Sequence, residues 1–413
     1  MGYYIQKGSK GYWSTIAALF LGSFVTFALL YCFQPLIPVF SSSYGIAPSM
    51  ASLSISLTTA SMAIAMLFMS SFSDLKGRKS LMVISLVGST GLTLILPFVE
   101  NFYLLLFLRV LQGILIAGYP AIAMTYIQEE FDPAITGTVM GIFVSGNSIG
   151  GLLGRLIVST VSDFYSWQVA IGCIGIICGG ISLWFFIKLP LSKNFKTKNT
   201  SWRQLIAKFR ENLQCGELIC FYLIAFCIMG SFVALYNYVE YPLIAPPYSL
   251  SQTVVGFIFV IYLCGTFSSI FLGKIADKHG AERVLLFSLF LMLVGVLITL
   301  FMPLMMKIFG IAVFTFGFFG SHSIASSCVV KVLPHGKVQS SALYLLFYYV
   351  GSSFLGALGG EFLLWYGWKG VVFLISIAIS IAMVISLLLI LRKTKNKYSY
   401  KSNKYTITFA KNP

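Results

Sequence analysis

The segment SSFSDLKGRK at residues 70–79 follows one long apolar run and precedes another, and a related segment, GKIADKHG, recurs at residues 273–280. In each copy an Asp is followed three residues later by a Gly, among basic residues. A carboxylate can cap the start of a helix, and a Gly permits a sharp turn. The two segments therefore indicate tight turns between helices at equivalent places of a duplicated chain.

The apolar runs around these segments are long enough to cross a bilayer, which takes about 20 residues of helix. They are continuous rather than alternating, so they indicate helices and not the strands of a barrel. The sequence predicts an all-α membrane protein with twelve spans, near residues 13–40, 49–72, 80–99, 102–126, 135–161, 167–189, 217–241, 252–274, 283–304, 307–332, 338–362 and 368–391.

Composition supports a membrane protein. The chain is 58% hydrophobic and 10% charged, and its mean hydropathy is +0.90, whereas soluble domains carry about 25% charged residues. The net charge of +16 is divided among short segments between the apolar runs. A nucleic-acid-binding protein would gather such charge on one folded face, so we exclude nucleic acid as a partner.

The placement of the basic residues predicts the orientation. Most of the 28 Lys and Arg residues fall in segments on the same side of the membrane as the two termini. By the positive-inside rule, both termini are expected in the cytoplasm. Four basic residues are exceptions: Lys307 and Lys369 fall on the opposite side, and Arg109 and Arg155 lie within apolar runs.

The chain repeats itself at an offset of roughly 200 residues. Six spans form each half, so both halves enter the membrane in the same direction as parallel repeats. We expect an N-terminal bundle at 1–189, a basic linker at 190–216, a C-terminal bundle at 217–391 and a disordered basic tail at 392–413. Within the linker, residues 202–209 are compatible with a short surface helix or with plain linker.

The stretch GNSIGGLLGR at 146–155 places small residues along one helical face. Such a face lets a neighbouring helix approach closely. Arg155, near the end of its span, is either a gate residue between the halves or an anchor that reaches toward the interface. The predicted packing glycines are Gly146, Gly150, Gly151, Gly154 and Gly351 of the second half.

Polar residues within spans predict a central cavity. An Arg in a span is costly and faces the protein interior or a cavity, so Arg109 is expected to hold an anionic substrate, to act on a proton site or to serve a structural role. The residues predicted for a substrate or proton cavity are Gln34, Arg109, Gln112, Asn147, Tyr236, Asn237, Glu240, His322, Tyr344 and Tyr348.

Two of these residues are candidates for carrying a proton. Glu240 lies closer to a span interior than the other acids, and His322 is the mid-span residue that titrates near neutrality. The alternatives are that Glu240 is an exposed loop acid and that His322 is a neutral residue bonded to nearby serines.

These segments resemble motifs of the major facilitator superfamily. In that family the Asp/Gly loops act as gates, and their basic residues pair with the other half in one conformation only; the gating residues implied here are Asp74, Gly77, Arg78, Lys79, Gly273, Asp277 and Gly280. RVLQG at 109–113 resembles the motif linked to proton coupling, and 146–155 resembles the antiporter motif, with Gly151 in place of the usual Pro. The segments at 34–38, 236–248, 318–323 and 344–353 resemble the bacterial drug:proton antiporters and arabinose-efflux-like exporters.

The resemblance implies a secondary active transporter of the bacterial inner membrane. It implies alternating access and export of small organic molecules, drug-like compounds or sugars, in exchange for protons. An importer of a specific solute and a non-transporting receptor or scaffold are the alternatives. The sequence holds no ATP-binding loop and no catalytic motif, so we expect no enzyme activity, cofactor or metal. The expected partners are a small-molecule substrate, protons and the lipid bilayer, and we expect a monomer.

Overall fold

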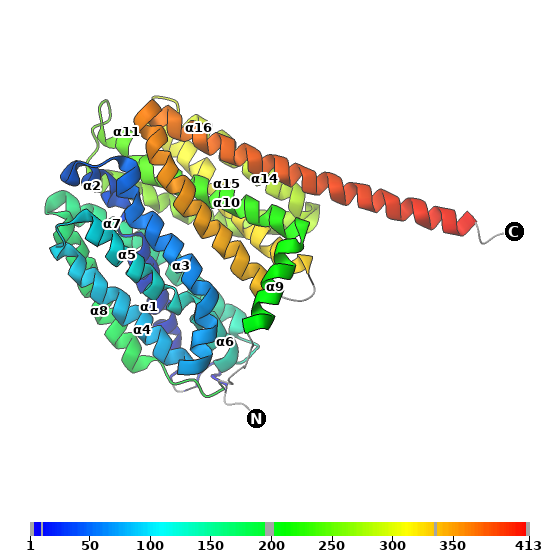
Figure 1. The fold of residues 1–413 in the computed structure, drawn as a ribbon, viewed down its shortest axis with the longest axis horizontal. Helices are drawn as coiled ribbons and strands as arrows, with labels where there is room; N and C mark the ends of the chain where they lie inside the picture. The colour runs from blue at the N-terminus through cyan, green and yellow to red at the C-terminus, as the bar shows by residue number, and fades with distance from the viewer. Residues whose placement is uncertain (1–3, 10, 195–201, 334–336, 410–413) are drawn as a thin grey trace. The chain divides into compact units, whose positions relative to one another are not determined.

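The computed structural model describes residues 4–9, 11–194, 202–333 and 337–409 (Figure 1). These residues form helices joined by short turns, with one isolated bridge between Ile5 and Phe131. A helix satisfies its own backbone groups, which is required in hydrocarbon. The predicted all-α membrane fold is confirmed, and eleven helical stretches among the described residues are long and apolar enough to span a membrane.

The first half folds into eight α-helices and two 3-10 helices that match the six predicted spans. Figure 1 shows them in blue to green. They are α1 (Tyr12–Tyr31), η1 (Gln34–Leu36), α2 (Ile37–Tyr44), α3 (Pro48–Lys76), α4 (Arg78–Ile95), η2 (Leu96–Phe98), α5 (Phe102–Ile116), α6 (Gly118–Glu130), α7 (Thr136–Phe164) and α8 (Trp167–Lys188).

The first span is broken between α1 and α2. Pro35 and Pro38 have no backbone N–H, so neither can donate a helical hydrogen bond to the preceding turn. The chain passes through the short η1 helix and resumes as α2, which ends at Gly45 with a φ of 62°. This break brings the Gln34 side chain into the protein interior.

A short helix, α9 (Trp202–Gln214), follows the first half, so residues 202–209 of the linker are helical. The second half comprises α10 (Gly216–Tyr238), α11 (Glu240–Ile244), α12 (Gln252–Gly256), η3 (Phe257–Ile261), α13 (Tyr262–His279), α14 (Ala281–Ile298), α15 (Leu304–Val332) and α16 (Lys337–Phe409).

The element α16 is two helices joined at Gly367, whose φ of 60° and ψ of −152° are not helical. The eleventh and twelfth predicted spans lie on either side of this break. The structure continues α16 to Phe409, where the sequence predicted a disordered tail from Arg392. The stretch from 371 to 409 contains neither Gly nor Pro, so no residue in it interrupts a helix.

Glycines allow α7 to pack closely on α1. A Cβ atom built at Gly150 would lie 2.3 Å from the carbonyl oxygen of Phe24, and one at Gly154 would lie 2.8 Å from the Cα atom of Ala28. Gly146 meets the same helix through Phe20. These predicted packing glycines therefore lie where only a hydrogen atom fits between two backbones.

The contacts divide the chain into two compact units. The first comprises Met1–Ile206, Gly230–Tyr262 and Tyr349–Leu374, and the second comprises Ala207–Met229, Leu263–Tyr348 and Ile375–Pro413. The first unit thus contains the whole first half together with the end of α10, all of α11, α12 and η3, the first residue of α13 and part of α16. This division differs from the sequence repeat, because parts of the second half pack against first-half helices.

The helices of the first half run between two ends of the first unit. One end carries Ser43, Tyr44, Val99 and Trp167, which lie together around the turns at 45–47, 99–101 and 165–166; we call it the Trp167 end. The other end carries the turns at residues 77 and 131–135, and we call it the Arg78 end.

In the second unit, α14 and α15 are in close contact through glycines that the sequence analysis did not single out. A Cβ atom at Gly295 would lie 2.3 Å from the backbone nitrogen of Phe314, and one at Gly317 would lie 2.6 Å from the carbonyl oxygen of Ser288. Close packing by small residues therefore occurs in both units.

Candidate functional site

Arg109 on α5 is enclosed by first-half helices and exposes 0% of its surface. Its Nε donates to the carbonyl of Ser54 at 2.8 Å, and its terminal nitrogens donate to the carbonyls of Leu29 at 3.2 Å and Leu30 at 3.0 Å. It also donates to the Gln112 amide oxygen. The guanidinium group therefore connects α5 to α1 and α3 through several charged hydrogen bonds.

These bonds explain how α1 can end inside the protein. The last carbonyls of a helix lack donors within the helix and need other partners. Arg109 supplies donors to two of them, and the Phe33 ring just after the helix covers its guanidinium carbon at 4.2 Å. The sequence predicted Arg109 and Gln112 in a cavity, with a structural role as the alternative for Arg109. In the structure both side chains are buried, and their described hydrogen-bond partners lie within the first half.

Arg155 on α7 is the start of a chain of hydrogen bonds between the halves. Its Nε donates to the Gln34 amide oxygen at 2.7 Å, and the Gln34 amide nitrogen donates to the Asn237 amide oxygen at 2.7 Å. We call Arg155, Gln34 and Asn237 the polar bridge. All three expose 2% or less of their surface, so the Arg155 side chain is enclosed by the protein.

Aromatic rings from both halves enclose the Arg155 guanidinium carbon. The ring centroid of Tyr31 lies at 4.3 Å, and those of Phe259 and Tyr262 both lie at 4.9 Å. The predicted cavity residue Tyr236 stacks on Phe259 with a centroid distance of 5.6 Å. These cation–π contacts hold the cation in an interior that offers it no carboxylate hydrogen bond among the described residues.

Glu240 lies one helical turn after Asn237 and exposes 1% of its surface. Neither carboxyl oxygen has a hydrogen-bond partner among the described residues, and the amide nitrogen of Asn237 also lacks one. Arg155 acts on this carboxyl group electrostatically. Glu240 is therefore a buried acid beside the polar bridge and not the exposed loop acid that the sequence allowed.

Further contacts join the halves at the Trp167 end. Ser159 on α7 donates to the carbonyl of Gln252 at 2.5 Å, and Asp163 accepts from the Thr253 hydroxyl at 2.6 Å and its backbone N–H at 3.1 Å. We call Ser159, Asp163, Gln252 and Thr253 the latch. The Gln252 amide also donates to the Pro35 carbonyl at 2.8 Å, so the latch and η1 are connected directly.

A second contact of this kind joins α3 to α16. Ser49 donates to the Glu361 carboxylate at 2.6 Å, and a Cβ atom at Gly360 would lie 2.3 Å from the Ser49 backbone nitrogen. Ser49 corresponds to Gln252 in the repeat, at an offset of roughly 200 residues, and Glu361 lies on the second-half segment that corresponds to the end of α7. The two crossings between the halves are therefore related by the repeat.

Asn147 belongs to the interface between α1 and α7, where its amide oxygen accepts from the Ser23 hydroxyl at 2.7 Å. Gly151 lies beside Arg155, whose terminal nitrogen donates to the Gly151 carbonyl at 2.8 Å. Gly351 offers its carbonyl oxygen 2.7 Å from where a Cβ atom of Gly230 would lie. These predicted residues thus support the packing around the bridge.

The second unit holds the other predicted cavity residues as one aromatic cluster. These residues are His322, Tyr344 and Tyr348, and the ring of Phe318, which was not predicted for the cavity, completes the cluster. The His322 Nδ1 lies 3.0 Å from the Tyr344 hydroxyl, and its ring is 4.7 Å from that of Tyr348 and nearly parallel to that of Phe318. His322 is bonded to a tyrosine rather than to the serines that the sequence suggested.

The predicted gating loops are only partly described. Gly77 and Gly280 have φ values of 85° and 94°, so both occupy turns that favour glycine. Gly273 and Asp277 lie on the last turns of α13, where Asp277 is exposed. Asp74 lies in α3, and its side chain is outside the described part of the structure.

Arg78 pairs within its own half at the Arg78 end. Its Nε and terminal nitrogen donate to both carboxylate oxygens of Glu129 at 3.0 and 2.9 Å. The sequence predicted a partner in the other half, but Glu129 on α6 lies closer because α4 and α6 are in contact. Lys79 lies over the Phe186 ring at 5.6 Å.

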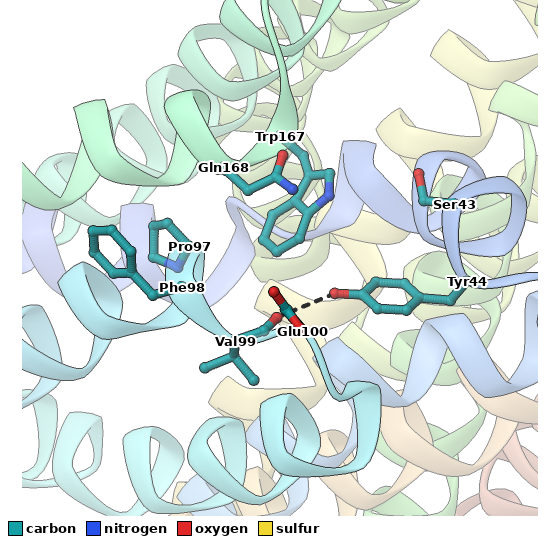
Figure 2. A pocket seen from close by; sticks show the side chains of 8 residues that line it. All are labelled: Ser43, Tyr44, Pro97, Phe98, Val99, Glu100, Trp167 and Gln168. Atoms are coloured by element: carbon teal, nitrogen blue, oxygen red, sulfur yellow. Dashed lines mark hydrogen bonds between the residues drawn. The ribbon is translucent and has the colours of Figure 1, made fainter.

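A surface pocket of about 500 Å³ lies at the Trp167 end of the first half (Figure 2). Figure 2 shows Tyr44, Phe98, Glu100 and Trp167 around it, with the Tyr44 hydroxyl donating to the Val99 carbonyl at 3.4 Å. None of the residues predicted for the cavity lines this pocket.

Sequence reasoning missed the latch and Glu129. Ser159, Asp163, Gln252 and Thr253 lie near span ends, where polar residues are ordinary, and nothing local in the sequence indicates their partners. The sequence signal that could have indicated the latch was the repeat. It makes the start of α12 in the second half equivalent to the start of α3 in the first half.

The family model described as Major Facilitator Superfamily matches residues 19–334 and 221–410. The MFS-type transporter YybF of Bacillus subtilis is 42% identical over 91% of this chain and 93% of its own length. The inner membrane transport protein YnfM of Escherichia coli is 39% identical over 91% of this chain and 90% of its own. Among solved structures, a point mutant of the nucleoside transporter NupG aligns over 91% of this chain and 99% of its own, with a TM-score of 0.75 and 15% identity.

Proposed function

The chain belongs to the Major Facilitator Superfamily and is a multi-pass membrane transporter, and from that premise we propose that it exports small organic molecules in exchange for protons. The proposal places it in the bacterial inner membrane, with the Arg78 end in the cytoplasm, as the distribution of basic residues predicts. Transport proceeds by alternating access, and the polar bridge and latch close the outer side.

One observation carries the proton coupling: Glu240 is a buried acid without a hydrogen-bond partner among the described residues, beside a buried arginine and between the two halves. Burying a charged carboxylate without hydrogen bonds costs several kcal/mol, so this environment favours the neutral form of Glu240. A group that is neutral in one conformation and charged in another carries a proton as the conformations alternate. The sequence contains no ATP-binding loop, which favours a gradient as the energy source.

The substrate class is proposed from the aromatic cluster of the second unit. His322, Tyr344, Tyr348 and Phe318 offer ring faces and few fixed charges. Such walls bind planar organic molecules by stacking and apolar contact. A thermal-shift screen over dyes, sugars and organic anions identifies candidates, because a ligand that binds the folded state raises its stability.

Replacing Glu240 with Gln is expected to reduce substrate-driven proton flux by about tenfold or more, because the amide keeps the size of the side chain but neither gains nor releases a proton at physiological pH. The measurement uses proteoliposomes with an internal pH dye and the best dye ligand from the screen. Glu100→Gln, an exposed acid at the same end, is the matched control and should retain wild-type flux.

His322→Ala tests the other candidate in the same assay. If Glu240 carries the proton, the histidine variant retains coupled proton flux and changes only the substrate concentration that drives it. Wild-type flux in Glu240→Gln would contradict the coupling proposal. Movement of the dye in the same direction as the protons, instead of in the opposite direction, would favour the importer.

A further inference from the structure

We propose that Arg155 is a two-position switch that donates to Gln34 while Glu240 is neutral and to Glu240 once that carboxyl group is charged, so that a proton on Glu240 keeps the latch closed. This inference rests on the proposed function and adds how the proton at Glu240 controls the outer gate. All the residues involved lie in the first unit.

The arrangement described is the closed position. Arg155 is committed through Nε to Gln34 and through a terminal nitrogen to the Gly151 carbonyl, and it makes no hydrogen bond to Glu240. A guanidinium group carries five N–H donors, so it can exchange partners without leaving its place. The ring faces of Tyr31, Phe259 and Tyr262 provide a surface on which the planar group can turn.

The groups around Glu240 leave Arg155 as its sole cationic partner among the described residues. Tyr241 on the same helix interacts with it electrostatically, and Tyr31 and Tyr262 lie against Arg155. The neighbouring helix α12 has the sequence QTVVG and carries no titratable side chain, and Asp163 on α7 is bonded to Thr253. A carboxylate at position 240 therefore attracts Arg155 above all.

Turning Arg155 toward Glu240 removes the donor from the Gln34 amide oxygen. Gln34 is the central member of the polar bridge, and the adjacent Pro35 carbonyl accepts from Gln252 of the latch. A buried amide that loses a charged partner no longer has its full set of hydrogen bonds, which destabilises the closed arrangement. Charging of Glu240 is thus transmitted over two hydrogen bonds to α10 and, through η1, to α12.

The test measures how accessible the latch is. Ser159→Cys places a thiol at a position that is buried while the latch is closed. The purified full-length protein in nanodiscs is labelled with a maleimide, and peptide mass spectrometry reads the modification at residue 159 alone, so the native cysteines remain. A separate Gln168→Cys protein reports an exposed thiol at the same end and corrects for the effect of pH on thiol reactivity.

With Glu240 present, the corrected labelling of Cys at 159 is expected to rise about tenfold or more between about pH 5.5 and about pH 8.5, because a rising pH favours the charged carboxylate, which takes the donor away from Gln34. Glu240→Gln should keep labelling slow throughout that range, and Glu100→Gln should behave as the wild type. Gln34→Leu, which breaks the bridge without changing any charge, should label fast even at the lower pH.

A Glu240→Gln protein that retains the wild-type rise with pH overturns the switch, as does a Gln34→Leu protein that stays slow at low pH. The transport assay separates this inference from the proposed function. If Glu240→Gln loses proton flux but keeps the wild-type labelling profile, the switch proposal is wrong and the proposal that Glu240 carries the proton stands. Intact proton flux in that variant removes the coupling itself.

Discussion

The variant Arg109→Leu is expected to lose about 3 kcal/mol or more of folding stability, because it removes a buried cation and leaves several buried carbonyl groups without donors. The affected carbonyls are those of Leu29 and Leu30 at the end of α1 and of Ser54 on α3. Leucine fills part of the space but supplies no donor, so the break in the first span loses its support. A drop in the thermal unfolding temperature in mild detergent and a loss of monodisperse protein are the expected results.

Arg109→Lys is the informative comparison. Lysine keeps the charge but presents one compact ammonium group, which cannot reach α1, α3 and Gln112 together as the planar guanidinium does. We expect an intermediate unfolding temperature. Wild-type stability in both variants, with loss of ligand binding alone, would show that Arg109 serves the substrate and not the fold.

The fold was predictable from the sequence because each span is a continuous apolar run and the two halves repeat in order. The positions of the apolar helices and the turns at Gly77 and Gly280 follow from those patterns. The grouping of second-half segments with the first half was not predictable. It depends on which ends of the helices meet, and apolar periodicity is the same at both ends of a span.

The sequence predicted that Arg109 and Arg155 lie within spans, but it did not predict which residues they contact. A buried Arg in a span indicates an interior position, yet Arg109 and Arg155 have different partners for a reason the spacing does not reveal. Arg109 faces the orphan carbonyls created by the break in α1, whereas Arg155 faces Gln34, which that same break turns inward. The prolines that break the first span are visible in the sequence. Which arginine contacts the end of α1 and which contacts Gln34 depends on how the helices pack, and the sequence does not reveal that packing.

Gly150→Leu is expected to cost about 3 kcal/mol or more, because even a Cβ atom at this position would overlap the backbone of α1 at Phe24. Backbone atoms of a buried helix cannot move aside as a flexible side chain can, so the variant has to push α1 away from α7. That displacement would also separate Gln34 from Arg155, since Gln34 follows directly after α1 and Arg155 belongs to α7. Both the unfolding temperature and proton-coupled transport should fall.

Gly141→Leu on the same helix is the matched control. A Cβ atom at Gly141 meets no atom within 4 Å, so the larger side chain enters open space, and leucine is the better helix former. Its stability is expected to stay within about 0.5 kcal/mol of the wild type. Equal unfolding temperatures for the two variants would contradict the close approach of α1 and α7, and with it the rigid support on which the polar bridge depends. A fall confined to Gly150→Leu locates that support at the small-residue face, where the position of Arg155 is set by the packing of α7 on α1.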